Sequence, residues 1–156
     1  MIIDVFLDLK KAFGTVDVDS MLQILANYGI QGTVFAWFRS WLTERKQQTI
    51  FDGHLSVEEP INIGIPQGTP LSCELFSLYI NAIVSVLLYC KIKLFADDTQ
   101  IRIVCKPDEF DQKIVQLSDD LMQIFIFLCS RKLKLNISKT KYMIISAQPV
   151  NPTCHR

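Results

Sequence analysis

The sequence predicts an α+β fold in which helices cover one face of an antiparallel sheet. Apolar residues recur at three- and four-residue spacing in several segments, which indicates amphipathic helices. Short runs rich in β-branched and aromatic residues lie between these segments and indicate strands. A chain of 156 residues with 49% apolar content is long enough to build one domain around its own core. We therefore expect strands and helices that pack as two layers.

The predicted elements alternate between strands and helices along the chain. In order they are a strand at 1–9, helices at 21–28 and 34–42, a hairpin at 47–57, a long helix at 71–88, strands at 91–96 and 99–105, a helix at 107–128 and a strand at 142–146.

Local signals mark the elements of the first half. Residues 1–9 are rich in Ile, Val, Leu and Phe, as in a strand buried on both faces, and Asp8 lies at the end of this strand. Ser20 can cap the first helix, which Gly29 ends. Asp52-Gly53 is a tight-turn dipeptide between two apolar runs and predicts a hairpin.

The second half contains the two longest helical patterns. A loop rich in Gly and Pro precedes the apolar repeat of 71–88. Pro107 opens the last helix, whose apolar residues recur over five turns and give the clearest periodicity in the chain. We expect one domain at residues 1–147 and an unstructured tail at 148–156.

Cysteine content and hydropathy indicate the cellular compartment of the protein. The chain has five cysteines and no CxxC pair, which favours free thiols in an intracellular protein, either nuclear or cytoplasmic. The longest apolar runs fall well short of the roughly 20 residues of a membrane helix. The N-terminal residues lack the pattern of a secretion signal because acidic residues interrupt them.

Charge is unevenly distributed although the net charge is zero. All 16 acidic residues precede Arg131, whereas six of the 16 basic residues follow Ser130. Clustered basic residues can bind nucleic-acid phosphates, so the C-terminal segment is a candidate contact region. By charge alone, a solvated surface or a frayed tail is the favoured explanation of this segment.

Asp97 and Asp98 are adjacent carboxylates between two predicted strands, and Asp8 ends a third. Carboxylates held close together stay ionised at low cost only around a cation, and oxygen ligands suit Mg²⁺. Alternation along a strand would separate Asp97 from Asp98 unless both lie at a hairpin turn. If Asp8 lies on a neighbouring strand, the three could hold two Mg²⁺ for phosphoryl transfer. The alternative is an ordinary polar turn.

Five segments resemble, in the right order, the palm motifs of reverse transcriptases, above all those of the non-LTR retrotransposon type. The resemblance covers residues 3 to about 145. The matching segments are Phe6 to Phe13, Ile65 to Ser72, Leu75 to Asn81, Phe95 to Thr99, and Leu133 to Asn136 followed by Lys139-Thr140.

The resemblance implies an RNA-directed DNA polymerase that extends a DNA primer with dNTPs along an RNA template. It implies a palm-like sheet, with Asp8, Asp97 and Asp98 binding two Mg²⁺, or Mn²⁺ in their place. It also implies that Lys139 lies near the triphosphate, where its ammonium could neutralise or protonate the departing pyrophosphate. Without the resemblance, Lys139 would be one more surface lysine.

The resemblance also implies a nucleotide site. Phe13 matches the bulky residue that packs against the sugar and excludes a 2′-hydroxyl, with Lys11 and Ala12 beside it. Gln67 and Gly68 match the loop next to the template and nucleotide, where glycine allows a close backbone approach. From the pattern alone, Phe13 would be a core residue and Gln67-Gly68 a helix-entry turn.

Three departures leave other functions open. Gly14 stands where the family usually has an acid, Cys73-Glu74 replaces a segment that usually contains proline, and Ala82 replaces another acid. The fingers and thumb regions are expected to be largely absent. One alternative is a catalytically inactive retrotransposon remnant or a domesticated interaction module. The other is the palm of an RNA-dependent RNA polymerase, which Phe13 argues against because a ribonucleotide needs room at its sugar.

Overall fold

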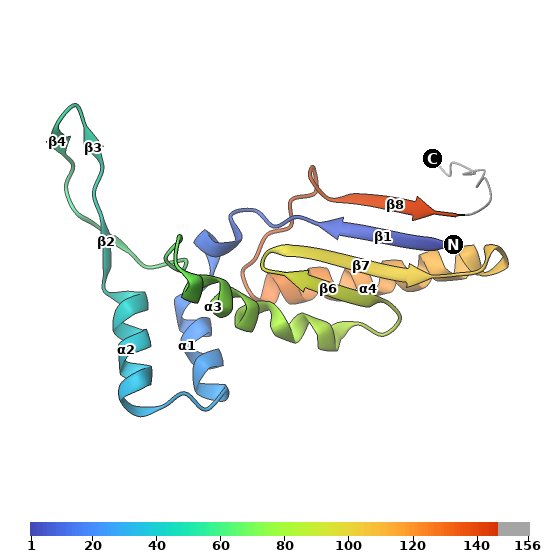
Figure 1. Cartoon of the computed structure of the whole chain (residues 1–156), viewed down its shortest axis with the longest axis horizontal. Helices are drawn as coiled ribbons and strands as arrows, with labels where there is room; N and C mark the ends of the chain where they lie inside the picture. Colours follow the sequence, from blue (N-terminus) through green and yellow to red (C-terminus); the bar gives the residue numbers. More distant parts are fainter. Residues whose placement is uncertain (147–156) are drawn as a thin grey trace.

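The computed structural model describes residues 1–146, and its centre is a four-stranded sheet (Figure 1). The strands lie in the order β6-β7-β1-β8, and all three neighbouring pairs are antiparallel. Their bounds are Ile2–Leu7 for β1, Lys91–Phe95 for β6, Asp98–Val104 for β7 and Lys141–Ile145 for β8. The predicted α+β fold with an antiparallel sheet is therefore confirmed.

Helices pack against this sheet and against one another. Helix α4 runs behind the sheet in Figure 1 and contacts β7, while α1 packs against both α2 and α3. Within the described residues the α-helices are α1 Val18–Asn27, α2 Gly32–Thr43, α3 Pro70–Ile80 and α4 Phe110–Ser130, and the 3₁₀ helices are η1 Ala12–Thr15, η2 Asn81–Val86 and η3 Pro107–Glu109.

The two faces of the sheet differ, and the prediction that the first strand is buried on both faces is wrong. Ile3, Val5 and Leu7 of β1 are buried with the helices in the core. Phe6, on the opposite face, is 39% exposed. Apolar composition alone misled here because the open face carries apolar side chains that no helix covers.

Asp4 is buried on this open face because it forms an ion pair with a neighbouring strand. Arg102 of β7 lies directly opposite Asp4 in the register. Its Nε donates to Asp4 Oδ1 at 2.7 Å and its Nη2 donates to Oδ2 at 2.8 Å. This paired geometry occupies both carboxylate oxygens.

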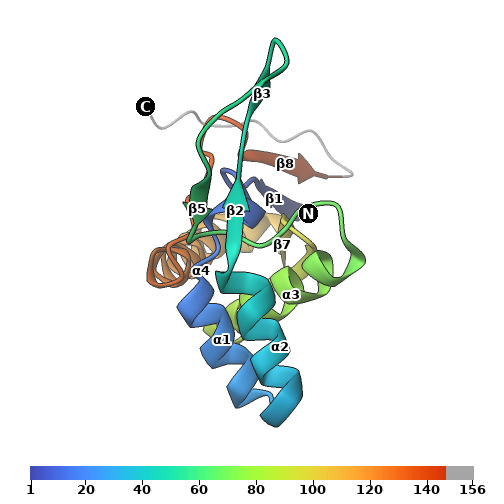
Figure 2. The same ribbon diagram turned by 90° about the vertical axis from the view of Figure 1, so that its left-hand side faces the viewer.

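Residues 45–61 form a narrow two-stranded arm that extends beyond the sheet (Figures 1 and 2). Strand β2, Arg45–Gln47, pairs with β5, Glu59–Ile61, and β3, Ile50–Phe51, pairs with β4, His54–Leu55. Asp52 and Gly53 have φ values of 48° and 77°, the positive values that a type I′ turn requires. The predicted tight turn is confirmed.

Three helix boundaries differ from the prediction. Pro107 opens the 3₁₀ helix η3, and α4 itself begins at Phe110. Helix α1 is capped by Asp17 rather than Ser20, because the Asp17 carboxylate accepts from the Ser20 backbone N–H at 3.0 Å. The predicted helix at 71–88 ends as an α-helix at Ile80 and continues as η2. Apolar spacing continues into η2, so it could not reveal the change to tighter 3₁₀ bonding.

Among residues 1–146, no helix is both long and apolar enough to cross a bilayer. The predicted tail at 148–156 and the last residue of the predicted domain lie outside the described residues.

Candidate functional site

The acidic doublet lies at the tip of the β6–β7 hairpin. Ala96 and Asp97 form the two-residue turn, and Ala96 has a φ of 51°. Asp98 is the first residue of β7 and pairs with Phe95. The prediction that both acids lie at the turn is therefore correct for Asp97 and wrong for Asp98. The turn is nevertheless what frees Asp97 from the strict alternation of the strand.

The β1–β7 register indicates which face of the sheet Asp8 and Asp98 share. The last registered pair is Leu7 with Thr99, so the same alignment carried one step further sets Asp8 opposite Asp98. Residues directly opposite each other on antiparallel strands project to the same face. Asp8 and Asp98 therefore share the open face of the sheet, which is the neighbouring-strand arrangement that the sequence required.

Asn136 flanks Asp8 on its other side. A short segment at 133–136 pairs with the end of β1, through a Leu9–Leu135 bridge and a 2.8 Å bond from Lys10 N to Lys134 O. Asn136 binds Asp8 twice, from its backbone N to Asp8 O at 2.7 Å and from Nδ2 to Oδ2 at 2.7 Å. Sequence reasoning noted this motif but missed the contact. The alternating Leu-Lys-Leu-Asn pattern was the available signal for a paired strand.

A cavity of about 580 Å³ lies between η1, the loop before α3 and the β6–β7 turn. It is lined by the start of α3 and by six of the predicted site residues: Lys11, Ala12, Phe13, Gln67, Gly68 and Asp97. The structure thus gathers all five predicted nucleotide-site residues in one cavity together with one of the three carboxylates.

Local contacts and backbone conformations hold the residues that line this cavity. Phe13 stacks on the buried Phe76 of α3, with ring centroids 4.9 Å apart. Gly68 has a φ of 83°, whereas an added Cβ there would meet nothing within 4 Å. Backbone conformation, rather than the expected close approach, is what favours glycine at this position. Thr69 then caps α3 by accepting from Ser72 N at 3.3 Å, and Pro70 follows at its first position.

Backbone contacts join the two sides of the cavity. Ile65 N donates to Phe13 O at 2.9 Å, and Gly64 N donates to Val16 O at 2.8 Å. Gly64 has a φ of 75°, and a Cβ added to it would lie 2.9 Å from the Cα of Gly14. This close approach requires glycine at position 64. It does not require glycine at position 14, because the atoms that a Cβ on residue 64 would meet there are backbone atoms that any residue has.

Asp98 also borders a second hollow, of about 520 Å³, over the open face of the sheet. Phe6, Lys93 and Phe95 line it together with Asp98. The end of the hairpin therefore separates two hollows, with Asp97 on one and Asp98 on the other.

Lys139 is not brought to either hollow. It is exposed in the turn that follows Asn136, and its backbone N donates to Asn136 O at 3.1 Å. This turn connects the 133–136 segment to β8. Lys139 is therefore close to Asn136 in the sequence, but it lies outside the cavity.

Asp8, Asp97 and Asp98 do not form a closed group. Among residues 1–146, no three Asp, Glu, His or Cys side chains are arranged so that they could hold a metal ion. Asp8 and Asp98 share a sheet face and Asp97 lines the adjoining cavity. Mg²⁺ prefers oxygen ligands, so these three carboxylates are chemically suitable ligands for it.

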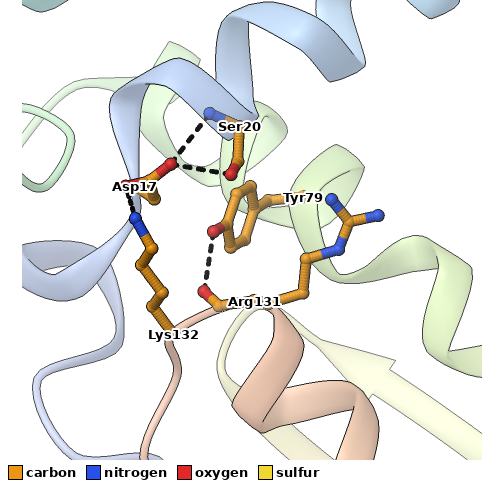
Figure 3. A network of polar contacts seen from close by, with 5 residues as sticks. All are labelled: Asp17, Ser20, Tyr79, Arg131 and Lys132. Atoms are coloured by element: carbon orange, nitrogen blue, oxygen red, sulfur yellow. Dashed lines mark hydrogen bonds and ion pairs between the residues drawn. The ribbon is translucent and has the colours of Figure 1, made fainter.

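A polar network anchors the segment that leads to Asn136 (Figure 3). Lys132 Nζ lies 2.5 Å from Asp17 Oδ2, and Asp17 Oδ1 accepts from the Ser20 hydroxyl at 2.7 Å. Tyr79 of α3 donates from its hydroxyl to Arg131 O at 2.7 Å. The hydrogen bond from Lys132, followed by those from Ser20, lowers the pKa of Asp17 to about 2. The network ties the end of α4 to α1 and α3.

Comparisons with known proteins give a consistent result. Residues 3–153 match the family described as reverse transcriptase (RNA-dependent DNA polymerase). A Pol polyprotein of the type-1 retrotransposable element R2 from Popillia japonica is 30% identical over 106 residues, which are 60% of this chain and 18% of that protein. The chain thus spans less than a fifth of the curated relative it matches.

Solved structures support the same fold. A truncated apo telomerase from Candida tropicalis matches with a TM-score of 0.65 and 12% identity, over 96% of this chain and 32% of that one. A telomerase from Candida albicans, in complex with a fragment of telomeric RNA, matches with a TM-score of 0.65 and 13% identity, over 97% and 28%. Since the family match covers nearly the whole chain, the protein belongs to the reverse transcriptase (RNA-dependent DNA polymerase) family.

Proposed function

We propose that residues 1–147 are a polymerase palm that extends a DNA primer with dNTPs on an RNA template. One observation carries this proposal: Asp8 and Asp98 share one sheet face, beside a cavity that contains Asp97 and the predicted nucleotide residues. In the reaction, the primer 3′-hydroxyl loses its proton to solvent and its oxygen bonds to the α-phosphorus of the nucleotide, while the bond from that phosphorus to the leaving pyrophosphate breaks. Carboxylates next to a nucleotide-sized cavity suit that chemistry.

The cavity has the size and lining that a dNTP needs. Its volume of about 580 Å³ is within the usual range of small-molecule sites. Phe13 offers an aromatic face for the sugar, Lys11 supplies a cation, and the start of α3 faces the same space, where a helix N-terminus favours phosphate. Phe13 is held from behind by Phe76, so it can resist displacement by a 2′-hydroxyl.

Asp8, Asp97 and Asp98 would hold two Mg²⁺ only if the tip of the hairpin brings the three carboxylates closer together than they lie in this structure, and Mn²⁺ could replace Mg²⁺. When bound, such ions would make the primer hydroxyl more acidic and stabilise the charge on the leaving pyrophosphate. Lys139 would act on the pyrophosphate only if the turn that carries it moves towards the cavity, because it lies outside the cavity in this structure.

Nucleic acid is the proposed partner. One structural match is a telomerase bound to telomeric RNA, and the curated relative is a retrotransposon Pol polyprotein. The second hollow lies over the open sheet face next to Asp98, and Lys93, Phe6 and Phe95 line it. A cation beside aromatic rings suits the end of a primer strand.

Primer extension on an RNA template with Mg²⁺ and dNTPs tests the proposal. We expect Asp98→Asn to reduce the rate by at least about 100-fold, because it removes a charge at the reacting phosphate. Asp52→Asn, in the turn of the distant arm, is the matched control, since asparagine tolerates the positive φ there. Unchanged activity in Asp98→Asn would refute the role of the acidic doublet.

A non-catalytic module that keeps the same fold is the second candidate. The absence of a closed three-ligand group among residues 1–146 favours it. Calorimetry separates the two candidates. Saturable Mg²⁺ or Mn²⁺ binding that Asp8→Asn abolishes supports the polymerase, whereas wild-type protein without such binding supports the module.

A further inference from the structure

We propose that Asn136 is a positioning residue that fixes the carboxylate of Asp8 for metal binding. Its Nδ2 donates to Asp8 Oδ2 at 2.7 Å. That contact occupies Oδ2 and leaves Oδ1 as the oxygen that would bind a cation. The inference rests on the metal role proposed above for Asp8.

Asp8 lies between Asn136 and Asp98. On one edge of β1, the segment at 133–136 reaches Asp8 through the Asn136 backbone bond of 2.7 Å. On the other edge, the register of β1 with β7 ends at Leu7 and Thr99, the residues next to Asp8 and Asp98 in the sequence.

The amide of Asn136 is itself held in one orientation. The Ser138 hydroxyl donates to Asn136 Oδ1 at 2.8 Å. Since Oδ1 is thereby occupied as an acceptor, the Nδ2 side of the amide faces Asp8. Asn136 O also accepts from Thr140 N at 2.9 Å and from Thr140 Oγ1 at 3.0 Å, which fixes the backbone of this turn.

A comparison with Asp4 on the same strand shows what the neutral donor achieves. Asp4 lies four residues before Asp8 on the same sheet face, and Arg102 occupies both of its oxygens. That guanidinium cancels the negative charge that a metal ion would need. The amide of Asn136 orients Asp8 on one oxygen only and leaves its charge intact. Outer partners of this kind commonly tune metal affinity by 10- to 100-fold.

Mn²⁺ titration followed by electron paramagnetic resonance tests the role without any need for polymerase activity. The difference between wild type and Asp8→Asn defines the Mn²⁺ bound through Asp8. We expect Asn136→Ala to weaken that binding by at least about 10-fold. The backbone bond from Asn136 to Asp8 survives this substitution. Asn81→Ala is the matched control, because Asn81 also donates from its amide, to the Tyr28 hydroxyl at 3.3 Å, and lies in η2.

Primer extension over a Mg²⁺ series gives a second measurement. A positioning role predicts that Asn136→Ala raises the half-saturating Mg²⁺ concentration and regains much of its rate at high Mg²⁺, and that Asn136→Gln recovers part of the affinity. A purely structural role would lower the active fraction and leave the Mg²⁺ dependence unchanged, which would overturn the inference.

Two further outcomes keep the inference separate from the proposed function. Wild type that binds Mn²⁺ through Asp8 but extends no primer refutes the polymerase and leaves Asn136 testable. If Asn136→Ala does not fold, Ser138→Ala replaces it, with a smaller weakening expected because the amide can then rotate. If the variant that is measured binds Mn²⁺ as tightly as wild type does, the inference is refuted.

Discussion

Replacing Gly64 with alanine should destabilise the protein and disturb its nucleotide cavity. Gly64 has a φ of 75°, and its added Cβ would lie 2.9 Å from both the Cα and the O of Gly14. Alanine in this left-handed conformation costs about 1–2 kcal/mol. Forcing a methyl group against rigid backbone adds about 1–3 kcal/mol. Together these predict a loss of roughly 2–4 kcal/mol, since the two effects overlap in part.

Gly14→Ala is the matched control for the same contact. An added Cβ at Gly14 meets nothing within 4 Å, and its φ is not positive. Alanine there should stabilise the protein by about 0.4–1 kcal/mol, because it reduces the freedom of the unfolded chain. The same open space accommodates Gly14→Asp, so restoring the acid usual in the family should leave the fold intact.

Urea unfolding of the two variants measures this difference, and the KM for dNTP in primer extension reports on the cavity. We expect Gly64→Ala to raise KM, because Gly64 and Ile65 bond the backbone next to Phe13. Gly64→Ala that is as stable as wild type, or Gly14→Ala that loses more than about 1 kcal/mol, would refute the reasoning from this contact.

Three other predictions concern stability and thiol reactivity. Asp120 is fully buried and accepts backbone N–H bonds from Leu88, Tyr89 and Cys90 at 2.7–2.9 Å, so Asp120→Asn should cost about 3 kcal/mol in urea unfolding, and a loss below about 1 kcal/mol would contradict this. Burial, together with Asp120, raises the pKa of Cys90 to about 12, so at pH 8 a thiol reagent should modify the exposed Cys73 and Cys129 but spare Cys90 in native protein. Asp17 has its pKa lowered to about 2, so the folded state binds fewer protons there, and up to about 2 kcal/mol of stability present above pH 4 should be lost as the pH falls towards 2. Exposure of Lys132 reduces that figure, and Asp17→Asn should flatten the acid dependence.

Much of the fold could be predicted because local sequence signals agree with the elements that form. Apolar periodicity located α4, and Asp52-Gly53 located the turn of the arm, since each signal depends only on neighbouring residues. The burial of Asp4 could not be predicted. It depends on Arg102, a partner that only the strand register supplies.

The candidate site likewise has a part that the sequence predicts and a part that it does not. Motif order predicted that Phe13, Gln67 and Gly68 belong together, and the cavity contains all three. The contact of Asn136 with Asp8 could not be predicted, because it forms between segments far apart in the sequence. Lys139 follows the same motif but lies outside the cavity, and no local signal fixes the path of a turn.

Six carboxylates of this protein fall into two groups according to their donors. Asp4, Asp17 and Asp120 each accept at least two hydrogen bonds, and the pKa of each is lowered. The donors around these three carboxylates already offset part of their negative charge, which makes them poorer metal ligands. Asp8 accepts one side-chain bond, from a neutral amide, and Asp97 and Asp98 lie at the rims of hollows. Acid should therefore weaken the fold through the first group, and metal ions should act through the second. A variant of one group should then leave the property governed by the other unchanged, so Asp17→Asn should alter acid stability without altering the affinity for Mn²⁺.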